Sequence, residues 1–224
     1  QVDRAVNAGA KFIVSPGFNP KVVSHCIEKN IPITPGISSP SELEQAIEMG
    51  LDAVKFFPAV PSGGLSMIKA LAAPYHTMRF MPTGGVTPQN LTEFLDYPKI
   101  LACGGTWMVK PELLATGNFE EISRLTRQTV RTMLDLKIDE LTLPFPHTGN
   151  NLSDALHGLI NLSSGSTKEL TISCRYLKRT IYHLEKNGAT FRYDNAKYDS
   201  AGNMYTIDFS DAPEEFSIRL IEKH

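Results

Sequence analysis

Short apolar runs that end in proline or glycine recur along the first half of the chain, separated by helical patterns. Each run is continuously apolar rather than alternating, as expected of strands buried on both faces of a parallel sheet. The units repeat at a spacing of roughly 20 to 26 residues, which is typical of βαβ units and suits a (β/α) barrel or a doubly wound sheet. The five runs are KFIVSP, IPITPGI, DAVKFFPA, MRFMPTGG and ILACGGTW.

The helical patterns between these runs carry recognisable start signals. Asn19 precedes a proline, an arrangement favoured at a helix N-cap and first turn. Ser39 stands three residues before Glu42 and predicts a capping box. Thr87 is again followed by a proline, which predicts a third helix start. These signals place helices between the strands and predict an α/β fold.

The number of strands decides whether the sheet can close into a barrel. A (β/α)8 barrel has eight strands, whereas the sequence offers five and opens within a helical pattern, QVDRAVNAG. We therefore expect a partial TIM barrel in residues 1–136, with about three strand–helix units missing upstream of the sequence.

The second half of the chain has a different pattern. A long amphipathic helix, FEEISRLTRQTVRTMLDL, is followed by an expected linker over residues 137–146. From there to residue 224 the pattern predicts a small β-α-β-β-β module, with turns at DSAGN and DAPEE. The module has little hydrophobic core of its own, so we expect it to pack against the barrel or against a second copy of itself.

Composition excludes several classes of protein. The net charge is −2 and there is no basic run, which argues against nucleic-acid or membrane-surface partners. No apolar run approaches the ~20 residues that span a bilayer. Three widely separated cysteines, Cys26, Cys103 and Cys174, predict no disulfide framework and favour a reducing, cytoplasmic setting.

One charged residue interrupts the apolar run DAVKFFPA. Strand alternation places Lys55 on the same face as Ala53 and Phe57, and Val54 with Phe56 on the other. No acidic residue lies beside Lys55 in the run, so burial would lower the pKa of its amine. A neutral lysine amine is a nucleophile toward carbonyl carbon and can form a Schiff base. The alternative is a structural lysine paired with a carboxylate from another strand.

Two glycine pairs follow the last two strands. The first is PTGG, residues 82–85, and the second lies in GGTW, residues 104–107. Glycines at strand ends let backbone N–H groups approach an anion, and Thr83 or Thr106 can add a hydroxyl donor. Each pair alone could simply form a tight turn. On adjacent strands of a barrel they predict a phosphate site.

Taken together, these stretches resemble the 2-keto-3-deoxy-6-phosphogluconate (KDPG) and 4-hydroxy-2-oxoglutarate aldolase family. The resemblance covers about the first 135 residues and implies a class I, Schiff-base lyase on a (β/α)8 barrel that needs no cofactor. Its motifs, in order, are AGAKFIVSPG, IPITPGISSPSELEQAIEMG, KFFPA, RFMPTGGVTPQNL and GGTWMV.

The resemblance also implies the role of each site residue. Lys55 is the Schiff-base residue, and Pro16 and Phe57 line a pyruvate pocket. The substrate phosphate is surrounded by Thr83, Gly84, Gly85, Gly105 and Thr106. The family usually has serine where this chain has Thr106, a change that keeps the hydroxyl.

The implied reaction cleaves KDPG to pyruvate and glyceraldehyde 3-phosphate. A second substrate that the resemblance implies is 4-hydroxy-2-oxoglutarate, which gives pyruvate and glyoxylate. In this family the acid/base glutamate and the carboxylate-binding arginine and threonine lie on the first three strands. This stretch alone is therefore expected to catalyse the cleavage very slowly, because acid–base catalysis by such a residue raises the rate roughly 10²–10⁴-fold. The resemblance also implies a homotrimer.

The C-terminal module resembles a glyoxalase-like (vicinal oxygen chelate) unit in YHLEKNGATFRYDNAKYDSAGN and in FSIRLIEKH. Such modules bind a metal through histidine and glutamate on strands. Here Arg219 stands where a ligand glutamate is expected, and His147 is isolated, so we predict no metal.

Two other functions remain open on the sequence alone. A phosphate-binding barrel isomerase or epimerase would share the glycine pairs but would not need the lysine of KFFPA. A non-catalytic scaffold for the C-terminal module is the third alternative.

Overall fold

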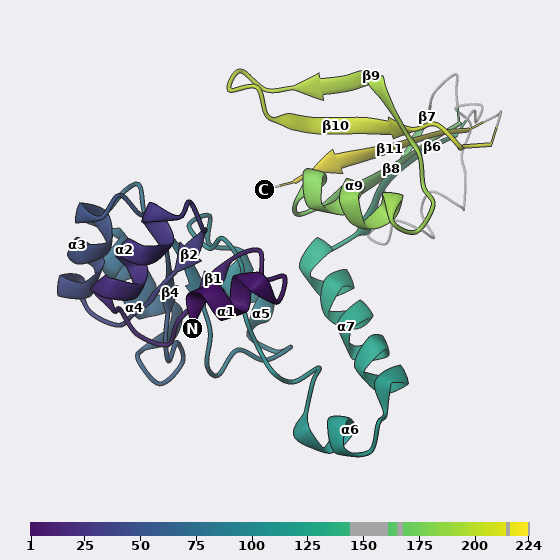
Figure 1. The fold of residues 1–224 in the computed structure, drawn as a ribbon. Helices are drawn as coiled ribbons and strands as arrows, with labels where there is room; N and C mark the ends of the chain where they lie inside the picture. Colours follow the sequence, from purple (N-terminus) through teal and green to yellow (C-terminus); the bar gives the residue numbers. More distant parts are fainter. Residues whose placement is uncertain (144–160, 165–167, 214–215, 224) are drawn as a thin grey trace. The chain divides into compact units, whose positions relative to one another are not determined.

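The computed structural model describes residues 1–143, 161–164, 168–213 and 216–223, and the chain divides into two compact units (Figure 1). Unit 1 is Gln1–Thr126 and unit 2 is Arg127–His224. Among the described residues, no helix is both long enough and apolar enough to cross a membrane.

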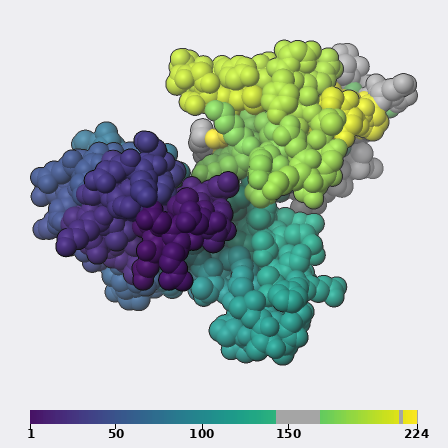
Figure 2. All heavy atoms as spheres, in the orientation of Figure 1, coloured from purple at the N-terminus to yellow at the C-terminus, as the bar shows by residue number. Residues whose placement is uncertain are grey.

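Unit 1 alternates short strands with helices, as the sequence predicts. The helix α1 lies at the surface of the unit, where its purple atoms are visible in Figure 2. The elements in order are α1 (Val2–Asn7), β1 (Ile13–Val14), α2 (Pro20–Glu28), β2 (Ile33–Thr34), β3 (Gly36–Ile37), α3 (Pro40–Glu48), β4 (Ala53–Phe56), α4 (Gly64–Ala72), β5 (Arg79–Pro82), α5 (Leu91–Leu95), α6 (Pro111–Ala115) and α7 (Phe119–Leu134).

All strand pairs in unit 1 are parallel. β1 pairs with β2, and β4 lies between β3 and β5. The expected strand IPITPGI is split into β2 and β3 at Pro35, whose nitrogen has no hydrogen to donate. The expected strand ILACGGTW is reduced to two isolated parallel bridges, Phe80 to Ile100 and Thr83 to Gly104.

Two of the predicted helix starts are confirmed. The Asn19 side chain accepts hydrogen bonds from the first-turn backbone of α2, and Ser39 and Glu42 form the capping box of α3. The third start is displaced, because α5 begins at Leu91 rather than at Thr87. Thr87 instead donates its backbone N–H to the Asn90 side chain, which closes a turn before the helix.

The two faces of β4 have different surroundings. Val54 and Phe56, which alternate onto one face, are fully buried, as are Ile68 of α4 and Phe80 of β5, which pairs with Val54. Lys55, on the other face, is only half-buried. Burying the aromatic and aliphatic side chains contributes about 1.5–3 kcal/mol each, so this apolar layer fixes which face of β4 presents the lysine.

In the part of the chain that the structure describes, unit 2 contains a mixed six-stranded sheet on which helix α9 packs. Its elements after α7 are β6 (Lys137–Leu143), β7 (Asn161–Ser164), β8 (Lys168–Cys174), α9 (Leu177–Glu185), β9 (Phe191–Tyr198), β10 (Met204–Phe209) and β11 (Phe216–Glu222). The strand order is β7-β6-β8-β11-β10-β9, in which β8 and β11 are parallel and adjacent at the centre (Figure 1). Leu177 and Ile181 of α9 pack with Ile207 and Leu220 of the sheet in one apolar core.

Unit 2 differs from the sequence expectation at its start. The predicted β-α-β-β-β order is present from β8 to β11, but residues 137–143, expected to be a linker, form strand β6. β6 pairs antiparallel with β8, Ile138 lying opposite Ile172. Residues 144–160, which include the rest of the expected linker and His147, lie outside the described residues.

Candidate active site

Lys55 lies at the centre of the three-stranded sheet of unit 1. Its strand neighbours are Gly36 on β3 and Met81 on β5. Neither neighbour is charged, and the described residues contain no ion pair to Lys55. The pKa of the Lys55 amine is therefore lowered by desolvation, because burial disfavours the charged form.

The Lys55 side chain lies against an aromatic ring. Its Nζ is 4.5 Å from the centroid of the Phe57 ring, within the range of a cation–π contact. The two side chains therefore lie together as predicted, although Phe57 stands one position beyond the end of β4 rather than on the strand. The structural alternative, a carboxylate partner from another strand, is not found among the described residues.

The lowered pKa gives a first testable expectation. A larger neutral fraction of Lys55 at a given pH makes its amine more reactive, so its acetylation by trace acetic anhydride should rise with pH around a midpoint below the ordinary lysine value of 10.5. Peptide mass spectrometry after labelling at several pH values measures the midpoint, with the exposed Lys21 as internal reference. A midpoint at or above 10.5 would contradict desolvation as the dominant influence.

Pro16 reaches this region through a close backbone contact. A Cβ added at Gly36 would lie 2.1 Å from the Pro16 carbonyl oxygen and 2.4 Å from its carbonyl carbon. Glycine at position 36 therefore lets the Pro16–Gly17 backbone lie directly on β3, next to the strand position that pairs with Lys55. The structure thus brings Pro16 to the neighbourhood of Lys55, although Pro16 itself is exposed.

The loop after β5 is joined to the segment after β4 by backbone hydrogen bonds. Thr83 donates to the Phe56 carbonyl (3.1 Å) and accepts from Ala59 (2.7 Å), and Val60 donates to the Gly84 carbonyl (3.0 Å). These bonds hold the predicted phosphate loop beside the strand that carries Lys55.

Both glycines of this loop adopt a backbone conformation that favours glycine. Gly84 has φ +89° and Gly85 has φ +85°, in the left-handed region that side chains rarely adopt. A Cβ at Gly85 would lie 2.5 Å from the Val60 Cβ, and one at Gly84 3.2 Å from the Phe57 ring. The glycine pair therefore allows the loop to pack closely on the segment after β4.

The second glycine pair lies next to the first. Gly104 donates to the Pro82 carbonyl (3.0 Å), and a Cβ there would lie 2.6 Å from Thr83 Cγ2. A Cβ at Gly105 would overlap the Trp107 ring, 1.7 Å from its nearest atom. Trp107 therefore covers Gly105, an arrangement that the motif GGTW did not reveal. Thr106 is exposed, and its carbonyl accepts a hydrogen bond from Val109.

Two hydroxyl groups near β4 have no partner among the described residues. The Oγ1 atoms of Thr83 and Thr34 are buried without a hydrogen bond there. Burying an unsatisfied hydroxyl is unfavourable, so such a group can donate to a bound ligand. Thr83 was predicted as a site residue. Thr34 was not, because a threonine in a strand gives no signal of its own.

No cluster of three or more potential metal ligands among His, Cys, Asp and Glu occurs in the described ranges.

Cys26 and Cys174 are buried free thiols, and Cys103 is partly buried. Burial raises the pKa of Cys174 to about 11, so this thiol is protonated and unreactive at neutral pH.

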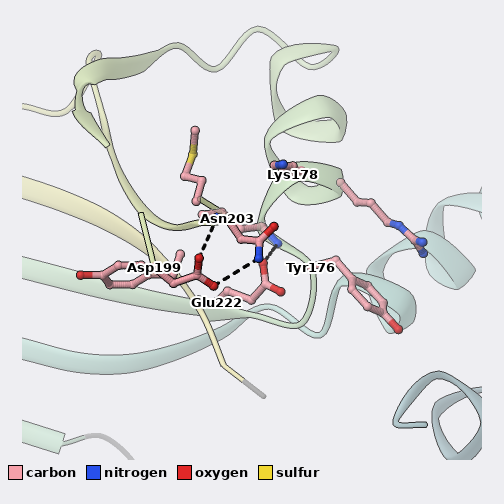
Figure 3. A pocket seen from close by; sticks show the side chains of 9 residues that line it. Tyr176, Lys178, Asp199, Asn203 and Glu222 are labelled. Carbon is pink, nitrogen blue, oxygen red and sulfur yellow. Dashed lines mark hydrogen bonds between the residues drawn. The ribbon is translucent and has the colours of Figure 1, made fainter. Parts of the chain in front are cut away.

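Unit 2 contains a separate cavity of about 260 Å³ at the start of α9 (Figure 3). Its polar groups are largely engaged with one another. Asp199 accepts hydrogen bonds from the backbone of Ala201 and Asn203 and from the Asn203 side chain. Glu222 accepts from the Leu177 backbone at 2.8 Å and so caps α9. These contacts order the turn and the helix start.

The Glu222 cap gives a second expectation. Glu222→Ala should lower the free energy of unfolding of unit 2 by about 1 kcal/mol, the usual value of a helix cap, whereas Glu222→Gln should lose less because it keeps an acceptor oxygen. Urea unfolding, with hydrogen exchange at the Leu177 amide, measures both. Glu185→Ala is the matched control, since Glu185 contacts the exposed Tyr193 instead. Equal losses in the two alanine variants would argue against the cap.

Comparison with known proteins gives consistent matches over unit 1. A family model described as KDPG and KHG aldolase matches residues 1–125. A 2-dehydro-3-deoxy-phosphogluconate aldolase of Treponema pallidum is 50% identical over 131 residues, which cover 58% of this chain and 62% of that protein. The KHG/KDPG aldolase of Escherichia coli K12 is 38% identical over 130 residues, covering 58% and 61%.

Solved structures match the same part of the chain. A KDPG aldolase of Legionella pneumophila, with pyruvate captured as a covalent carbinolamine intermediate, is 35% identical at a TM-score of 0.53, covering 59% of this chain and 61% of that one. A KDPG aldolase of Zymomonas mobilis with 3-phosphoglycerate is 34% identical at a TM-score of 0.52, covering 57% and 60%. The chain thus spans about three fifths of the length of the curated relatives it matches.

Proposed function

Because the chain belongs to the family of KDPG and KHG aldolases, we propose that Lys55 is the Schiff-base lysine of a class I aldolase. The proposal rests on the residues that surround the Lys55 amine. Lys55 is half-buried between the uncharged strand neighbours Gly36 and Met81, and desolvation lowers its pKa. A lowered pKa increases the neutral fraction of the amine, which is the form that attacks a carbonyl carbon.

The proposed reaction begins with attack of the Lys55 amine on the keto carbon of a 2-keto-3-deoxy sugar acid phosphate. Loss of water gives an iminium, which withdraws electrons from the bond between carbons 3 and 4. Cleavage of that bond in KDPG, with transfer of the proton of the carbon-4 hydroxyl to a general base, releases glyceraldehyde 3-phosphate. The remaining enamine is protonated at carbon and hydrolysed to pyruvate, which frees the lysine.

We assign the substrate phosphate to the two glycine loops, at Thr83, Gly84, Gly85, Gly105 and Thr106. Their closeness supports this assignment, because the loops meet at the bridge between Thr83 and Gly104. The buried and unpartnered Thr83 hydroxyl is available to donate to a phosphate oxygen. Pro16 and Phe57 would line the pyruvate end. The substrate 4-hydroxy-2-oxoglutarate lacks the phosphate and would use only the pyruvate end.

The wider organisation follows from the same assignment. We propose that residues 1–136 contribute strands of a (β/α)8 barrel, in a cytoplasmic homotrimer, and that the C-terminal glyoxalase-like module, assigned to residues 147–224, serves assembly or small-molecule sensing. The strand pairs β1–β2, β3–β4 and β4–β5 are all parallel, which supports the barrel. The β-α-β-β-β order from β8 to β11 supports the module.

Borohydride trapping with pyruvate tests the function directly. Reduction fixes an iminium as a stable secondary amine, and peptide mass spectrometry then identifies the modified lysine. We expect the adduct on Lys55. A folded protein that also carries the family's acid/base glutamate and carboxylate-binding residues, and that still forms no adduct at Lys55, would overturn the Schiff-base assignment and favour a phosphate-binding isomerase or a scaffold.

A further inference from the structure

We propose that the Phe57 ring stabilises positive charge on the Lys55 nitrogen and thereby favours the iminium form of the Schiff base. The inference rests on the proposed function for its chemical consequence. Its physical basis is the distance of 4.5 Å between Lys55 Nζ and the centroid of the Phe57 ring. At that distance the negative face of the ring attracts a cation.

The ring is held in place by its surroundings. The Phe57 backbone donates to the Ile37 carbonyl at 3.1 Å, which ties the residue to β3. The Phe57 Cδ2 and Cε2 atoms lie 3.2 Å from the position that a Cβ at Gly84 would occupy. Any side chain at position 84 would therefore press on the ring, so glycine there preserves the contact with Lys55.

No other described group supplies the negative charge that a cation on Lys55 would need. The strand neighbours Gly36 and Met81 are uncharged. Arg79, two positions before Met81 on β5, is itself cationic and is paired with Asp52 at 2.6 Å. Among the residues that the structure describes, the aromatic face is therefore the favourable electrostatic contact of a positive Lys55 nitrogen.

The charge of this nitrogen changes along the reaction. A neutral amine, a ketone and one proton give an iminium cation and one water molecule, so the nitrogen becomes positive when water leaves. Cleavage of the bond between carbons 3 and 4 returns electrons to the nitrogen and forms the neutral enamine. Protonation of the enamine carbon restores the iminium. The ring therefore stabilises the species before cleavage and after enamine protonation, whereas it does not favour the neutral enamine.

A fluorination series at position 57 separates ring electrons from ring shape. Phenylalanine with one, two or three ring fluorines, introduced by nonsense suppression, weakens the negative face stepwise with little change in size. We measure the Lys55 pKa by competitive acetylation and the pyruvate adduct at equilibrium by rapid borohydride reduction. From unsubstituted to trifluorinated ring, we expect the adduct constant to fall about five-fold and the pKa to fall by about 0.7.

Phe56 provides the matched control. It is fully buried on the opposite face of β4, so the same fluorination at position 56 should change neither quantity. Phe57→Leu, which keeps an apolar side chain without the ring electrons, should resemble the trifluorinated variant.

The two measurements distinguish failure of the inference from failure of the proposed function. A stepwise fall of both quantities at position 57 alone supports the inference. Values that stay flat along the series, with the wild-type adduct present, would overturn the inference and leave the aldolase function standing. If the wild type forms no adduct at Lys55, the proposed function fails, and the labelling pKa alone decides whether the ring stabilises the charge.

Discussion

Lys55→Met abolishes the borohydride-trapped pyruvate adduct. Methionine fills a similar volume but has no nitrogen, so no Schiff base can form at position 55. The fold should persist, because the variant replaces an amine that has no ion-pair partner among the described residues. We expect the free energy of unfolding to change by less than about 1 kcal/mol. Intact-protein mass spectrometry after trapping, together with urea unfolding, measures both effects.

Lys69→Met is the control for this experiment. Lys69 also lies over an aromatic ring, 5.6 Å from the Tyr97 centroid, but it is on helix α4 rather than on β4. The Lys69 variant should form the adduct at the wild-type rate. Undiminished trapping in the Lys55 variant would show that another lysine is the nucleophile.

Gly36→Ala should unfold unit 1 or destabilise it strongly. The added methyl would lie 2.1 Å from the Pro16 carbonyl oxygen. The backbone fixes the position of a Cβ and the carbonyl is itself backbone, so neither group can rotate away. We expect a loss of about 3 kcal/mol in the free energy of unfolding, the upper end for overpacked sites. Pyruvate trapping should fall as well, since Gly36 pairs with Lys55.

Gly17→Ala is a matched control one residue beyond Pro16. A Cβ at Gly17 would meet no atom within 4 Å, so this variant should unfold at nearly the wild-type urea concentration. Similar losses in the two variants would mean that glycine flexibility, and not the contact at Pro16, sets the stability.

Features set by neighbouring residues could be predicted from the sequence. The caps at Asn19 and Ser39 depend on groups within four positions, and both are confirmed. Strand alternation predicts that Phe57 lies beside Lys55, and the two side chains are in contact although Phe57 follows the end of β4. The roles of the site residues came from resemblance to a family and stay predictions until trapping is done.

Features set by distant partners could not be predicted. Strand β6 was expected to be a linker, because its partners β7 and β8 lie some twenty to thirty positions later and the pairing with them reveals the strand. Trp107 covers Gly105 through a side-chain orientation that no spacing rule gives. The unpartnered hydroxyl of Thr34 depends equally on what packs around it.

The position of β11 has a consequence for synthesis of the protein on the ribosome. β11 lies between β8 and β10 in the sheet of unit 2. The strand position between β8 and β10 therefore stays empty until residues 216–222 have left the exit tunnel. Until then β8 and β10 each lack a neighbour, and both offer bare backbone to proteases and to chaperones. Nascent unit 2 should therefore remain protease-sensitive until β11 has emerged, whereas the strands of unit 1, which pair with close neighbours in sequence, can pair before then.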